Sequence, residues 1–118
     1  MPKNDTFFDS YIESVIAQVK ENNPSFNLIN LENQVINDEQ VVRLTDAIKN
    51  NPYVTQINLR TNLTIESMKL LRDALRDNEH VKQIELSEHI NLPGYSQLKE
   101  EIEGIVVRNL RNRPHRIG

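Results

Sequence analysis

Cysteine is absent from this chain of 118 residues. Without a thiol, the protein can form neither a disulfide framework nor a thiolate zinc site, and it has no cysteine nucleophile. Long apolar runs are missing as well, because no segment approaches the roughly 18 apolar residues of a membrane-spanning helix. The N-terminus, MPKNDTFFDSYIESV, also lacks the uninterrupted apolar stretch of a secretion signal. We therefore expect a cytoplasmic protein in a reducing compartment.

Glycine is scarce, with three residues in the whole chain, and neither GxGxxG nor GxxxxGK followed by Ser or Thr occurs. No phosphate-binding loop is therefore indicated. The three histidines lie far apart in the sequence, with no pair at the i, i+4 spacing of a metal-binding helix. Carboxylates are numerous, but acid–base catalysis needs a cleft that shifts their pKa values. We expect no enzyme, no catalytic residues, no metal and no cofactor.

The overall charge is also modest, at -3, with 26% charged and 37% hydrophobic residues. This balance suits a folded chain better than a disordered one, and the length suits a single domain over residues 1–118. A protein that coats nucleic acid needs clustered Lys and Arg, so nucleic acid is an unfavoured partner.

One apolar pattern is present three times in the chain. It occurs in NPSFNLINLENQ (23–34), NPYVTQINLRTN (51–62) and NEHVKQIELSEH (78–89), where Ile29, Ile57 and Ile84 occupy matching places at separations of 28 and 27 residues. A period in the twenties indicates stacked supersecondary units. The alternating segments INL, INL and IEL predict strands at about 27–31, 55–59 and 82–86. Because the places match, we expect Ile57→Asp and Ile84→Asp to unfold the array alike.

Helical spacing follows each strand. The predicted apolar stripes are Val41, Leu44, Ala47 and Ile48 in the first unit, and Met68, Leu71, Ala74 and Leu75 in the second. Asn37 or Asp38 and then Thr64 are the expected N-caps. The Asn-Asn-Pro sequences at 22–24 and 50–52 suit helix ends, because Asn tolerates a left-handed cap. Parallel strands need such crossovers, so the strands are expected to be parallel.

Two further helices flank the repeats, which span residues 24–93. A helix at 5–21 is expected to cap the N-terminal end, and a helix at 94–112 is expected to cap the C-terminal end. Without such caps, the core faces of the terminal repeats would be exposed to solvent. The final helix presents a stripe of Leu98, Ile102, Ile105, Val106 and Leu110. Pro93-Gly94 predicts a turn before it, and residues 113–118 are expected to form a loose tail.

The strand pattern, an apolar residue, two spacers, Ile, one spacer and Leu, resembles that of leucine-rich repeats of the ribonuclease-inhibitor type. Within this type, NPYVTQINLRTNLTIESMKLLRDALRDNEHVKQIELSEH is similar to the leucine-rich repeat region of tropomodulins and leiomodins. The resemblance covers roughly residues 10–110. It implies an α/β fold: a short right-handed arc with three parallel strands on the concave side and helices on the convex side.

The same resemblance implies two details. Leucine-rich repeats place Asn three residues after the last strand Leu, where its amide binds the backbone of the turn. Only Asn62 matches, and Gln34 and His89 stand at the other two places. Actin or an actin-associated protein is a candidate partner through the resemblance alone.

Strand alternation places a varied set of side chains on the concave face. The candidate partner-binding residues are Asn30, Glu32, Gln56, Asn58, Arg60, Gln83, Glu85 and Ser87, with Leu28 beside them. A mixed polar surface with both charges suits a protein partner. The main hypothesis is therefore a non-catalytic protein–protein interaction module. The competing interpretation is an ordinary solvated sheet face.

The C-terminal sequence RNLRNRPHRIG supports an alternative function. It contains Arg108, Arg111, Arg113 and Arg116 and no acid, which suits a nucleic-acid or anionic-surface binder. These cations also complement a helix C-terminus, so a purely structural role explains them as well.

Overall fold

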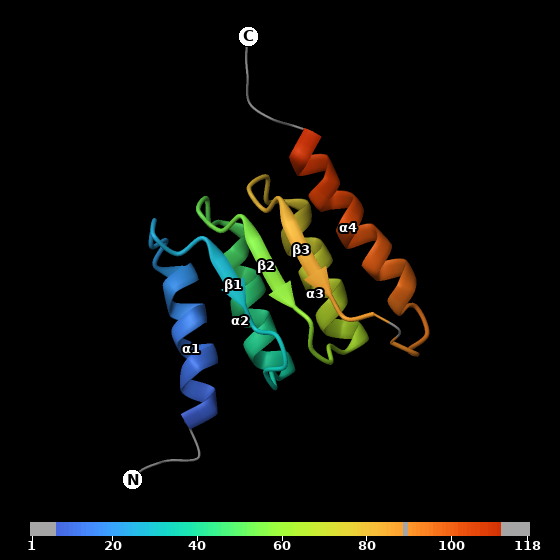
Figure 1. Ribbon diagram of the computed structural model, residues 1–118, viewed down its shortest axis with the longest axis horizontal. Helices are drawn as coiled ribbons and strands as arrows, with labels where there is room; N and C mark the ends of the chain where they lie inside the picture. The colour runs from blue at the N-terminus through green and yellow to red at the C-terminus, as the bar shows by residue number, and fades with distance from the viewer. Residues whose placement is uncertain (1–6, 89, 112–118) are drawn as a thin grey trace.

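A computed structural model describes residues 7–88 and 90–111. Helices and strands alternate along these residues (Figure 1). They are α1 (Phe7–Lys20), β1 (Leu28–Asn30), α2 (Asp38–Lys49), β2 (Gln56–Leu59), α3 (Ile65–Arg76), β3 (Gln83–Leu86) and α4 (Tyr95–Arg111). Each observed strand is one or two residues shorter than the predicted one. The predicted tail at 113–118 lies outside the described residues.

The three strands form one parallel sheet in the order β1-β2-β3. The repeat sets the register, since Ile29 pairs with Ile57 and Ile57 with Ile84. The helices lie together on one side of the sheet, and each packs on the next (Figure 1). The predicted mixed α/β fold with a three-stranded parallel sheet is thereby confirmed.

The core lies between the sheet and the helix layer. Ile29, Ile57 and Leu59 point into it from the strands and are almost fully buried. The α3 stripe is buried throughout, and in the α2 stripe only Ala47 is half-buried.

In addition, Ile84, Ile105 and Leu110 are less buried than the pattern predicts. Ile84 is half-buried, although its counterpart Ile57 is 1% exposed. Position at the edge of the sheet is not the cause by itself, because Ile29 in β1, the other edge strand, is 0% exposed. Leu110, predicted to join the final stripe, is 50% exposed near the end of α4. The repeat pattern correctly predicts the core of the middle unit and overestimates burial at the end of the array.

The predicted N-caps are present. Asn37 forms a capping box with Gln40, and the Thr64 hydroxyl accepts from the Ser67 amide at 3.0 Å. One of the two predicted helix ends is as expected: Asn22 adopts the left-handed conformation, with a φ of 56°. The other differs, because Asn50 has a φ of -109°. Asn50 therefore ends α2 without the left-handed cap expected there.

Buried asparagines join successive units. The Asn51 side chain donates to the Val19 carbonyl, that of Asn78 to the Ile48 and Asn51 carbonyls, and that of Asn109 to the Asn78 carbonyl. These three side chains lie at the helix-to-strand end of each unit. Asn62, the residue that matched the leucine-rich repeat pattern, is exposed and makes no side-chain hydrogen bond among the described residues. The resemblance implies a backbone-binding Asn62 after the strand, whereas the asparagines that bind backbone carbonyls between units lie at the opposite end of the strands.

Candidate functional site

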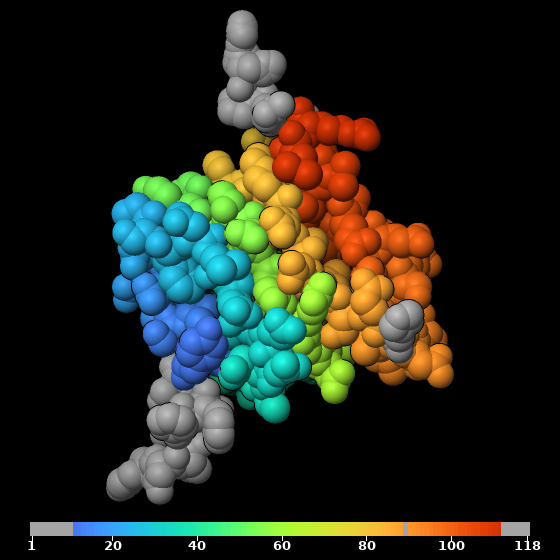
Figure 2. Space-filling view, in the orientation of Figure 1, coloured from blue at the N-terminus to red at the C-terminus, as the bar shows by residue number. Residues whose placement is uncertain are grey.

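The side of the sheet away from the helices, here called the open face, carries the predicted partner-binding residues. It consists of Leu28, Asn30, Glu32, Gln56, Asn58, Arg60, Gln83, Glu85 and Ser87. In the same orientation as Figure 1, the space-filling view shows the strand segments on the surface at the front of the molecule (Figure 2). Parallel sheets usually have both faces covered. An uncovered parallel sheet is therefore the most unusual surface of this fold.

Two of the predicted residues have a structural role. The side-chain oxygen of Asn30 accepts from the Glu32 amide at 3.2 Å, and that of Asn58 accepts from the Arg60 amide at 3.1 Å. Both asparagines thus bind the backbone two residues ahead, where their strands end, in the manner of an Asx turn. The equal placing of Asn30 and Asn58 in two repeats is the sequence signal for this role.

Polar and charged side chains of the open face contact one another across the strands. The Asn58 amide donates to Glu32 at 3.1 Å, and the Arg60 Nε atom lies 3.9 Å from a Glu85 oxygen. Arg60 and Glu85 are substantially exposed, and exposed pairs of this kind contribute little to stability.

Two glutamines lie at the centre of this surface without such contacts. Gln56 and Gln83 are paired in register and exposed, and neither side chain makes a hydrogen bond among the described residues. They border a shallow hollow of about 190 Å³. The hollow is lined by Leu28, Asn30, Gln56, Ile57, Asn58, Gln83 and Glu85. Ser87 lies at the margin, and its hydroxyl donates to the Thr61 carbonyl at 3.1 Å.

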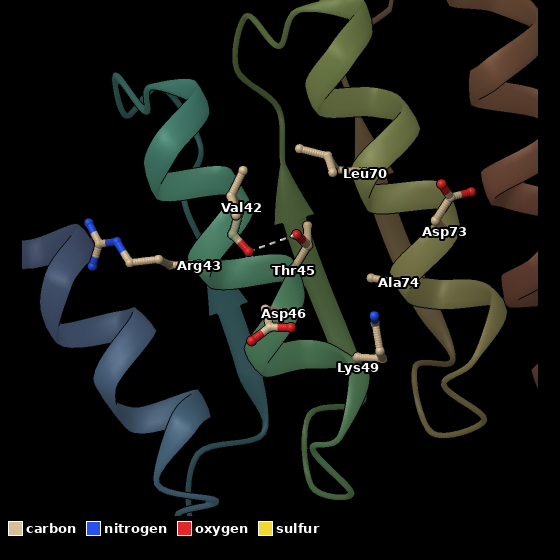
Figure 3. Close-up of a pocket in the computed structure, with 8 residues that line it drawn as sticks. All are labelled: Val42, Arg43, Thr45, Asp46, Lys49, Leu70, Asp73 and Ala74. Atoms are coloured by element: carbon tan, nitrogen blue, oxygen red, sulfur yellow. Dashed lines mark hydrogen bonds between the residues drawn. The ribbon is translucent and has the colours of Figure 1, made fainter.

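The helix side has a larger hollow, of about 350 Å³, between α2 and α3 (Figure 3). Val42 and Leu70 form its apolar part. Arg43 extends away from it towards α1, and the Thr45 hydroxyl donates to the Val42 carbonyl. Asp46, Lys49 and Asp73 also line it, and no hydrogen bond or ion pair joins these three side chains to one another.

Arg43 instead ties α2 to α1. Its guanidinium donates to both Glu13 carboxylate oxygens at 2.7 Å, and buried Gln40 adds a third contact at 3.3 Å. The hydrogen bonds from Arg43 lower the pKa of Glu13 from 4.5 to about 2, against the opposing effect of burial. This paired carboxylate has a structural role, and it stays ionised far into the acid range.

Of the two arginines that the structure describes in the C-terminal segment, Arg108 contacts the rest of the fold. The Arg108 guanidinium donates to the carbonyls of Arg76 and Asn78, both at 3.3 Å, and to the Asn109 side chain at 2.8 Å. Arg111 is exposed at the end of α4, and Arg113 and Arg116 lie outside the described residues. Arg108, which is half-buried, thus helps to hold α4 against the end of α3.

Across residues 7–88 and 90–111, no group of three His, Asp or Glu side chains is placed to hold a metal ion. His80 is exposed before β3, and His89 and His115 are outside these ranges. No helix in the described part of the chain has the length and apolar character to cross a membrane.

Comparisons with known proteins add the following. No protein-family model matches the sequence, and a search of curated proteins finds no match. Among solved structures, the chain is similar to the C-terminal domain of tropomodulin from Caenorhabditis elegans, with 12% identity, a TM-score of 0.38, and coverage of 85% of this chain and 93% of that one. It is also similar to actin-binding site 2 of leiomodin-1, with 15% identity, a TM-score of 0.37, and coverage of 94% and 92%. At these values the likeness carries no functional conclusion.

Proposed function

We propose that this chain is a non-catalytic protein-interaction module that binds a protein partner on its open face. The observation that carries the proposal is the uncovered side of a parallel sheet, a surface that most parallel sheets bury. Large side chains of this face, including Leu28 at 46% exposure, remain accessible.

The chemistry of the open face suits a protein more than a small ligand. Its hollow is shallow, its side chains are amides and charges of both signs, and its ion pairs are exposed. Protein interfaces use such mixed polar surfaces for specificity, through hydrogen bonds and matched charges. Repeated backbone with varied surface residues is also how solenoid proteins present a binding surface.

We further propose that the fold is a short, right-handed leucine-rich repeat arc with the open face on its concave side. The repeated strand sequences and the asparagines that join the units support this proposal. We also propose that the protein is cytoplasmic. The sequence resemblance to the tropomodulin and leiomodin repeat region makes actin the first partner to test.

The decisive experiment compares two identical substitutions at different places. Gln56→Arg adds bulk and charge at the centre of the open face, whereas Gln97→Arg makes the same change at an exposed position on α4. Neither side chain is buried, so both variants are expected to fold with stabilities within about 0.5 kcal/mol of the wild type. Actin binding is measured by cosedimentation for filaments and by fluorescence titration for monomers.

The proposal expects Gln56→Arg to abolish or strongly weaken binding, and Gln97→Arg to leave it unchanged. Equal binding by both variants would move the site off the open face. If the wild type does not bind actin, the actin assignment fails. Affinity capture with the same pair of variants then identifies a partner that distinguishes them.

A further inference from the structure

The two edges of the sheet are covered to different extents. At the β3 edge, α4 packs against the strand, Lys82 donates to the Asn109 carbonyl, and the Tyr95 hydroxyl donates to the Ser87 carbonyl. At the β1 edge, the described residues provide one such contact, from the Tyr11 hydroxyl to the Asn30 carbonyl at 2.7 Å. The β1 edge is thus the more open of the two.

Hydrogen bonds to β2 show which backbone groups of β1 point outwards. The Asn27 carbonyl accepts from the Thr55 amide, and the Leu31 amide donates to the Asn58 carbonyl, both at 2.9 Å. Residues that face a neighbouring strand alternate along a strand, so residues 27, 29 and 31 face β2. Leu28 and Asn30 therefore face the outer edge.

Three outward backbone groups have no hydrogen-bond partner among the described residues: the Leu28 amide, the Leu28 carbonyl and the Asn30 amide. The Leu28 side chain beside them is 46% exposed on the open face. Unpaired groups at a strand edge are complementary to another extended backbone, and an exposed apolar side chain adds a contact for the residue next to it.

We propose that the outer edge of β1 receives an extended segment of the protein partner as a fourth, parallel strand. The segment places an apolar side chain beside Leu28 and ends near Asn30, where Tyr11 already occupies the carbonyl. The parallel direction is assigned because Leu28 is the counterpart of Gln56, and the corresponding edge of β2 accepts β1 as a parallel strand. This inference rests on the proposed function, since it states how the partner attaches beside the open face.

The probe is the peptide SFNLINLEN, which copies residues 25–33, the segment that already pairs with the equivalent edge of β2. Amide hydrogen exchange in the full chain, followed by NMR, reports on each backbone group separately. At saturating peptide, the exchange of the Leu28 and Asn30 amides is expected to slow by about tenfold or more, with little change at Ile29.

Two methylated peptides provide a matched control. Methylation of the peptide nitrogen at its Ile removes an amide that faces β1, whereas methylation at the following Asn alters an amide that faces away. The first peptide is expected to lose binding and the second to retain it. In the protein, Leu28→Pro removes the outward amide at the first residue of the strand, a position that tolerates proline. This variant is expected to keep a cooperative melt and to bind the peptide about tenfold more weakly or worse.

Three results would overturn the inference. One is equal binding by the two methylated peptides. Another is slow exchange of Leu28 and Asn30 in the free chain, which would mean that the chain covers its own edge. The third is protection that rises with protein concentration, which would assign the edge to a second copy.

Binding of actin, or of the partner found by affinity capture, to the Gln56→Arg and Leu28→Pro variants separates the two proposals. Binding that is lost in Gln56→Arg but unchanged in Leu28→Pro would retain the open face and reject strand addition. Binding that is unchanged in both variants would reject both.

Discussion

At the residue scale, the buried asparagines are the most consequential polar groups of the fold. The Asn78 side chain donates to two carbonyls of the preceding unit and accepts from the amides of His80 and Val81 in its own. Four backbone groups therefore depend on one side chain that is 2% exposed. A side chain of this kind fixes the spacing between neighbouring units as well as the loop that leads into the strand.

Removal of this amide should destabilise the whole chain. Asn78→Ala leaves buried donors and acceptors unpaired, and we expect a loss of about 3 kcal/mol or more in the free energy of unfolding, measured by urea denaturation. The control is Asn62→Ala, which changes an exposed asparagine and should alter stability by less than about 0.5 kcal/mol. Similar losses in both variants would contradict the assignment of the joining role to Asn78.

The ion pair between Glu13 and Arg43 predicts that the free energy of unfolding depends on pH. Because the pKa of Glu13 is lowered in the folded state to about 2, its stabilising contribution is complete above pH 4.5 and is lost as the pH falls through 2. The Glu13 side chain is 44% exposed, so solvent screening limits the contribution to about 1 kcal/mol or less.

Urea midpoints between pH 6 and pH 2 test this contribution. The stability of Glu13→Gln should fall less than that of the wild type over this range, because the variant has no carboxylate to protonate at this position. Glu100→Gln is the control, since Glu100 is exposed and belongs to no ion pair among the described residues. Parallel curves for the wild type and Glu13→Gln would show that the pair contributes nothing.

At the scale of elements, the sequence predicts the strands and helices well because each has its own periodicity. Alternation over INL, INL and IEL identifies the strands, and the capping residues Asn37 and Thr64 mark where α2 and α3 begin. These signals are local, so neighbouring sequence is sufficient to read them.

The features that the sequence did not reveal depend on tertiary position. A repeat pattern treats Ile84 in β3 as identical to its counterpart in β2, so it does not show that Ile84 is only half-buried. The joining role of Asn51, Asn78 and Asn109 requires carbonyls from the preceding unit to be within reach. The bonds of Asn30 and Asn58 on the open face are local by contrast, and the repeated asparagine is a sequence signal for them.

Alanine substitutions at the two glycines that the structure describes, Gly94 and Gly104, are expected to change the stability in opposite directions. A Cβ atom at Gly104 would meet no atom within 4 Å, whereas Gly94 has a φ of +85° just before α4. Gly104→Ala should stabilise the chain by about 1 kcal/mol, because alanine restricts the unfolded chain and favours a helix. Gly94→Ala should cost about 1 kcal/mol, because an L side chain is strained at that φ. Thermal melts check both signs, and a loss of stability in Gly104→Ala would point to a contact that the packing of α4 does not show.

At the scale of the whole molecule, the main packing contacts within residues 7–88 and 90–111 join neighbouring units. Packing runs from α1 to α2, α3 and α4 in turn, and from β1 to β2 and β3. In such an array the middle unit has two interfaces and a terminal unit has one, so damage in the middle should spread in both directions. The asparagines add to this coupling, because each joins one unit to the carbonyls of the unit before it.

Aspartate substitutions at Ile57 in β2 and at Ile84 in β3 test this difference between the middle unit and a terminal unit. Ile57→Asp buries an unpaired charge at a position that is 1% exposed, at a cost of several kcal/mol, which is about the full stability of a small domain. We expect it to abolish the cooperative thermal melt seen by circular dichroism. Ile84→Asp, at a half-buried position in the last strand, should lower the midpoint while leaving a cooperative transition. Gln56→Asp, next to Ile57 but on the open face, is the control and should melt like the wild type. Equal damage from the two isoleucine variants would show that the third unit is as central to the core as the second.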